Sequence, residues 1–68
     1  MSTVDRIVDL SEGVIGTAVL LSDMVQLLGE DVLDEFDELG LKGSDLWCYY
    51  RECDKDMVKL LERIRSNP

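Results

Sequence analysis

The sequence contains no histidine, and its single proline, Pro68, stands at the end of the chain. Histidine is the commonest general base and metal ligand at neutral pH, so its absence argues against an enzyme and against a transition-metal site. Basic residues are also scarce, because 7 lysines and arginines stand against 15 aspartates and glutamates, for a net charge of −8. A chain of this charge repels phosphate backbones, which disfavours direct binding of nucleic acid.

Only two cysteines are present, Cys48 and Cys53. Small secreted domains of this size normally contain about two to four disulfides, and one pair so close in sequence would constrain little of the chain. On one helix the two side chains would lie about 140° apart, which suits neither a disulfide nor a shared metal. We therefore interpret both as reduced thiols of a cytoplasmic protein, with Cys53 in the core and Cys48 at the periphery.

Long apolar runs are missing as well. The longest apolar-rich stretch covers residues 14–28 and contains Asp23, whereas a membrane-spanning helix needs about 20 apolar residues. Residues 1–5 lack the basic start of a secretion signal, and no short apolar segment suitable for cleavage follows them. We therefore expect neither a membrane partner nor a cleaved signal.

The sequence does contain helical periodicity, in the segments 3–28, 30–39 and 44–65. We predict one all-α domain over residues 1–68, in which the two long helices pack antiparallel and the short helix 30–39, ended by Gly40, lies between them. Gly13 and Gly16 in the first segment and Asp54 in the third are alternative break points. The unbroken apolar repeat in both segments favours continuous helices.

The second half of the first predicted helix is apolar on two sides. One partner helix covers only one of these sides, so a second copy of the chain is expected to cover the other. The sequence therefore predicts a homodimer, with an interface that draws on Val14, Ala18, Leu20, Leu21, Met24, Leu27 and Leu28.

The strongest polar feature is a group of six carboxylates within nine residues, namely Glu30, Asp31, Asp34, Glu35, Asp37 and Glu38. The apolar residues of the same segment fall on one helix face, so these acids should point to solvent. One interpretation is a solvated face that keeps the protein soluble, and the other is a docking surface for a basic partner. The spacing lacks the alternating ligands and the glycine turn of a calcium loop. Lys42 is the only base nearby in sequence, so we expect the acids to be unpaired.

Three of the four aromatic residues, Trp47, Tyr49 and Tyr50, lie within four positions. Tyr50 and Trp47 belong to the apolar face of the third segment, whereas Tyr49 lies off this face and is a candidate partner contact. The segments 30–39 and 44–65 also have the proportions of a helix-turn-helix. The second of them, however, has no lysine or arginine before Arg51, and major-groove recognition needs cations.

These features favour a non-enzymatic protein-interaction module. It would be a small acidic regulator or inhibitor that docks on a basic surface of a partner, such as a nucleic-acid-binding protein, by mimicking phosphate charge. The alternatives are a helix-turn-helix-like transcriptional regulator and a structural homo-oligomeric subunit. We predict no catalytic residue, metal site or cofactor, because no nucleophile and base accompany the carboxylates.

Overall fold

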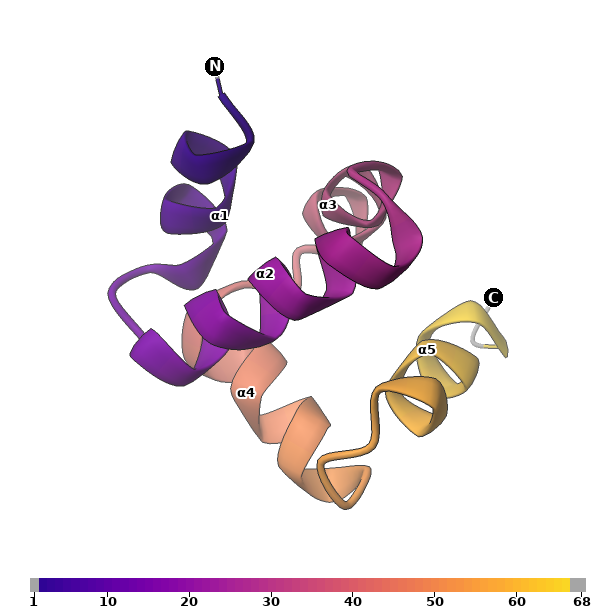
Figure 1. Cartoon of the computed structure of the whole chain (residues 1–68). Helices are drawn as coiled ribbons and strands as arrows, with labels where there is room; N and C mark the ends of the chain where they lie inside the picture. Colours follow the sequence, from indigo (N-terminus) through magenta and orange to yellow (C-terminus); the bar gives the residue numbers. More distant parts are fainter. Residues whose placement is uncertain (1, 67–68) are drawn as a thin grey trace.

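The computed structural model describes residues 2–66, and the chain forms five α-helices over this range (Figure 1). The predicted all-α fold is confirmed, with no strand among the described residues. The helices are α1 (Thr3–Ser11), α2 (Ile15–Leu28), α3 (Asp31–Leu39), α4 (Gly43–Glu52) and α5 (Met57–Ser66).

The continuous helix predicted over residues 3–28 is wrong, because the chain turns between α1 and α2. Glu12 ends α1 with φ 48°, and Gly13 follows with φ 81°. Glycine occupies this left-handed region without the steric conflict that a Cβ atom causes. The Val14 N–H then donates to the Ser11 carbonyl at 2.9 Å and closes the turn. As a result α1 and α2 pack against one another as neighbours.

The continuous helix predicted over residues 44–65 is wrong for a related reason. Asp54 and Lys55 both adopt left-handed backbone conformations, with φ 58° and 55°. Asp56 then begins α5, because its Oδ1 accepts hydrogen bonds from the N–H groups of Val58 at 2.9 Å and Lys59 at 3.3 Å. Asp54, the alternative break point in the sequence, therefore lies in the turn itself, two residues before the capping residue.

The predicted short helix 30–39 is present as α3. Gly40 ends it with φ 69°. The Gly40 N–H donates to the Asp37 carbonyl at 3.1 Å, and the Leu41 N–H donates to the Phe36 carbonyl at 3.0 Å. This pair of bonds is the Schellman motif that glycine favours at a helix end.

The core forms around α2, which packs against α1, α3 and α4 and crosses the middle of the molecule in Figure 1. Leu21 and Met24 are fully buried, and Leu20 is 4% exposed. Helices α3 and α5 add their own apolar faces to the same cluster, so α2 is covered on several sides within one chain. A second copy is therefore not needed to bury these three side chains, contrary to the expectation from the sequence.

None of the helices described is long and apolar enough to cross a bilayer.

Candidate acidic docking surface

The carboxylates of α3 are positioned by the apolar residues between them. Val32, Leu33 and Phe36 are at most 2% exposed and fix this helix on the core. The alternate positions therefore project outward. Five of the six predicted acids are exposed and Glu35 is half-buried.

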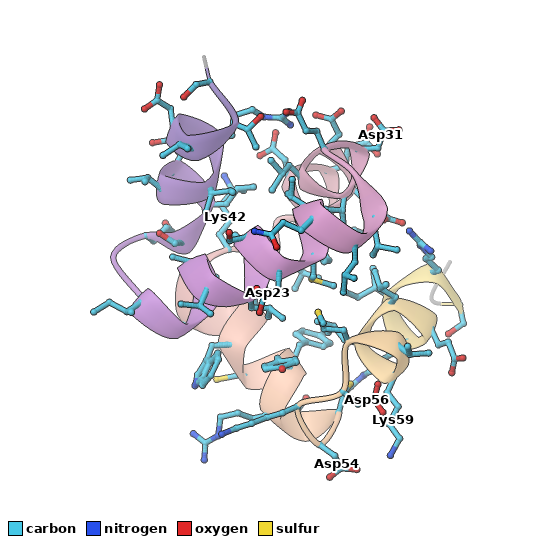
Figure 2. All side chains as sticks on the ribbon, viewed as in Figure 1. Asp23, Asp31, Lys42, Asp54, Asp56 and Lys59 are labelled. Carbon is cyan, nitrogen blue, oxygen red and sulfur yellow. The ribbon has the colours of Figure 1, made fainter. Side chains whose placement is uncertain are left out.

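Helix α1 packs against α3 and adds carboxylates that the sequence did not link to those of α3. The Thr3 hydroxyl donates to Glu30, and the Arg6 guanidinium pairs with Asp34. These contacts follow from the turn at Gly13, which brings α1 back alongside α3 instead of extending it into α2. We define the acidic surface as the carboxylates of α1 and α3 and of the capping residues Glu12 and Glu30 (Figure 2 labels Asp31); they are Asp5, Asp9, Glu12, Glu30, Asp31, Asp34, Glu35, Asp37 and Glu38.

The expectation that these acids lack internal cations is wrong for three of them. Besides the pair of Asp34 with Arg6, the Lys42 Nζ lies 3.7 Å from Oδ1 of Asp37. Arg65 donates through Nε and Nη2 to the two oxygens of Glu35, at 2.8 and 3.1 Å. Arg6 and Arg65 are 28 and 30 residues away from their partners, so only the fold reveals these pairs.

The contact with Arg65 also sets the ionisation of Glu35. Hydrogen bonding from the guanidinium lowers the pKa of the Glu35 carboxyl below its ordinary value of 4.5, although partial burial works in the other direction. The same hydrogen bond raises the pKa of Arg65. Glu35 is therefore ionised at neutral pH and its charge is balanced within the chain.

Five members of the acidic surface have no ion-pair or side-chain hydrogen-bond partner within residues 2–66. Two of them line the groove between α1 and α3, and all five are exposed. They are Asp5, Asp9, Glu12, Asp31 and Glu38. Because these charges repel one another without compensation, they form the part of the surface most favourable to an incoming cation.

A groove of about 300 Å³ runs between α1 and α3. Its walls carry Asp9 and Glu12 from α1 and Asp37 from α3, together with Arg6 and Lys42. Acids outnumber bases along the groove, so it extends the negative surface inward.

Tyr49 does not join this surface. Its half-buried ring lies in a different groove, with Leu39, Leu41 and Ile64. The guanidinium carbon of Arg63 lies 4.7 Å from the ring centroid, so a cation of the chain itself already covers one face of the tyrosine.

The residues predicted at an oligomer interface are spread over different environments. Val14 and Ala18 are half-buried, while Leu20, Leu21 and Met24 belong to the core. Leu27 and Leu28, at the end of α2, are 69% and 46% exposed. Of the predicted interface residues, only the last two are thus exposed.

The placement predicted for the cysteines is confirmed, because Cys53 is buried in the core and Cys48 is exposed. Across residues 2–66, histidine, cysteine and carboxylate side chains form no group of three suited to a metal ion. No family model, curated protein or solved structure matches this chain. The functional argument therefore rests on the acidic surface itself.

Proposed function

We propose that this protein is a non-enzymatic interaction module that docks the acidic surface of α1 and α3 on a basic surface of a partner protein. The observation that carries the proposal is the set of five exposed carboxylates that lack any partner in the part of the chain that is described. Three neighbouring acids pair with cations of the chain, so the fold neutralises only part of the charge of this surface. The five unpaired carboxylates carry the rest of the charge. Gathering like charges costs stability, which a cationic partner restores.

The partner class that fits is a protein with a phosphate-binding surface. Carboxylates projected from two adjacent helices present several negative charges at fixed positions, as a nucleic-acid backbone does. Complementary charge mainly accelerates association and selects against wrong partners. The chain would therefore act as a regulator or inhibitor that occupies the basic surface.

Two charge-matched variants test this function. The first neutralises unpaired members of the acidic surface, with Asp9→Asn, Asp31→Asn and Glu38→Gln. The control removes three charges from the α4–α5 side, with Asp45→Asn, Asp54→Asn and Glu62→Gln. Both change the net charge of −8 to −5, and each removes one aspartate from the first turn of a helix.

A partner captured from the source cells with the wild-type protein is then used to compare association rates at about 50 to about 500 mM salt. We expect the first variant to associate several-fold more slowly at low salt, and the difference to vanish as salt rises, because screening removes the attraction. The control should follow the wild type closely. Equal rates for the two variants would show that only net charge matters and would contradict the proposed surface.

The helix-turn-helix alternative is less well supported by the geometry. α4, which would enter the major groove, carries Asp45 in its first turn and its first cation is Arg51. The helix before it in the motif, α3, carries the largest group of acids.

We also propose that the protein forms a homodimer. Six of the eight exposed large apolar side chains found in residues 2–66 belong to α1 and α2.

A further inference from the structure

Trp47, on α4, packs against α2. A Cβ atom at Gly16 would lie 2.8 Å from the indole ring, so the ring lies directly against the backbone of α2. The ring of Tyr50 is 5.6 Å away between centroids, and the Lys55 Nζ is 5.7 Å from the Trp47 ring centroid. The indole is nevertheless only half-buried, which leaves a rigid aromatic edge at the surface.

Apolar residues of α2 continue this edge into a larger surface. Val19 lines the same groove as Trp47 and is 57% exposed. Ile15, one helical turn earlier, is 80% exposed. The centres of protein interfaces are more apolar than the surrounding surface, and tryptophan is enriched there.

The charges at this groove are balanced, unlike those of the acidic surface. Asp23 lines it from α2 and Lys55 from the turn after α4 (Figure 2 labels Asp23). Neither side chain forms an ion pair with another residue in the range 2–66. A face with one unpaired acid and one unpaired base can pair with a copy of itself, because a two-fold axis that passes between the two positions places each charge opposite its counterpart.

From these observations we infer that the α2–α4 groove is the interface of a two-fold symmetric homodimer. Val19 of each copy packs against Trp47 of the partner subunit, and Asp23 of each copy pairs with the partner subunit's Lys55. A second copy fits better than an unrelated protein, because each copy carries at this groove both the acid and the base with which the other copy pairs. The acidic surfaces repel one another and so remain outside the interface, which leaves two of them free per dimer.

Sedimentation equilibrium over about 1 to about 200 µM protein measures the assembly. We expect a monomer–dimer equilibrium for the wild type. In the same series, acrylamide quenching of the fluorescence of Trp47, the only tryptophan of the chain, should weaken as dimer forms. A monomer throughout this range, or unchanged quenching in the dimer, would overturn the inference.

Charge exchange tests the pairing itself. Asp23→Lys and Lys55→Asp should each raise the dimer dissociation constant about tenfold, because each variant places like charges opposite one another. The double exchange should restore the wild-type value. Because the symmetry pairs each copy's residue 23 with residue 55 of the other, an equimolar mixture of the two single variants should form a heterodimer more tightly than either forms a homodimer.

Glu62→Lys, on α5, changes the net charge by the same amount as Asp23→Lys and is the control. It lowers the overall repulsion between copies, so dimerisation should be unchanged or slightly stronger. Circular dichroism establishes that each variant is folded before it is compared. Failure of both the double exchange and the mixture to restore association would exclude the Asp23–Lys55 pairing and overturn the interface.

Discussion

The α1–α3 region and the α4–α5 region both carry many charges on short helices, but they differ in how far these charges are neutralised. Residues 1–43 contain ten acids and two bases, whereas residues 44–68 contain five of each. In the α4–α5 region the ion pairs join residues 5 and 11 positions apart. In the α1–α3 region the pairs with arginine join residues 28 and 30 positions apart, and the second of them reaches Arg65 of α5. Six of the ten acids have no partner within residues 2–66, namely Asp23 and the five unpaired members of the acidic surface.

This difference separates a region whose acids and bases are equal in number from a region with a large excess of acids. Two ion pairs of the α4–α5 region are local and form with little chain ordering beyond the helices, whereas Arg65 of α5 pairs with Glu35 of α3. The negative charge of the α1–α3 region is neutralised only in part, and only after folding brings the pairing residues together. Exposed ion pairs contribute little stability, so neither region is held together by its charges. The core must supply that stability, which gives the first and largest prediction.

Phe36→Ala should break the α1–α3 region completely. Phe36 is fully buried in the α3 face, and its removal costs about 3–5 kcal/mol. A chain of 68 residues has a total stability of roughly 3–10 kcal/mol, so much of the population should unfold at 25 °C. Urea denaturation followed by circular dichroism measures this loss. Val58→Ala, which changes a 63% exposed side chain of α5, is the control and should shift the stability by less than about 0.5 kcal/mol.

How far the sequence predicts each region follows from the range of the interactions involved. Helix α3 was predicted with its end at Gly40, because apolar spacing and a glycine stop are local signals. The prediction of two continuous long helices was wrong, since the apolar repeat continues in phase across the turns. Glu12, Asp54 and Lys55 adopt left-handed conformations at these turns, and such conformations are uncommon enough for these residue types that propensity does not reveal them.

The acidic surface was predicted only in its α3 part. The carboxylates of α1 were missed because their place beside α3 depends on the turn at Gly13. The partners of Asp34 and Glu35 were missed because sequence distance says nothing about tertiary contact. A glycine directly after Glu12 was the one available signal for the turn, and the apolar repeat outweighed it.

Gly16→Ala should weaken the link between α2 and α4, which joins the two regions. The added Cβ would meet the Trp47 ring at 2.8 Å, and such overpacking costs about 1–3 kcal/mol. Better helix propensity returns up to about 1 kcal/mol, so a net loss is expected in thermal denaturation, with a change in tryptophan emission. In a Trp47→Leu background the same substitution should be neutral or stabilising. A loss of equal size in both backgrounds would show that the ring is not the cause.

Substitutions in the two turns should change the stability in opposite directions. Gly13 has φ 81° and no side chain nearby, so Gly13→Ala should destabilise by about 1 kcal/mol through backbone strain alone. Asp54 has φ 58°, so Asp54→Gly should relieve strain and stabilise by about 0.5 kcal/mol. Chemical denaturation of both variants checks these signs. Destabilisation by both would mean that the pair of Asp54 with Lys59 outweighs the strain.

The smallest expected effect distinguishes the ion pair that joins α3 to α5 from an ion pair within the α4–α5 region. Arg65 binds Glu35 through two hydrogen bonds, whereas Glu52 accepts one, from Arg63 at 3.0 Å. The bidentate contact lowers the pKa of Glu35 in the folded protein, so its stabilisation is present above the unfolded value near 4.5 and is lost as pH falls through the lower folded value.

Glu35→Gln should therefore lower the melting temperature by a few degrees at neutral pH and by progressively less in acid, because the wild-type carboxyl becomes neutral there. Glu52→Gln is the matched control on the α4–α5 side, and its effect should be smaller at every pH, since a single exposed contact holds its partner less firmly. Melting curves between about pH 3 and about pH 7 measure both differences. A constant offset for Glu35→Gln over this range would show that the carboxylate acts as a neutral acceptor does, and the long-range pair would then contribute no more than the local one.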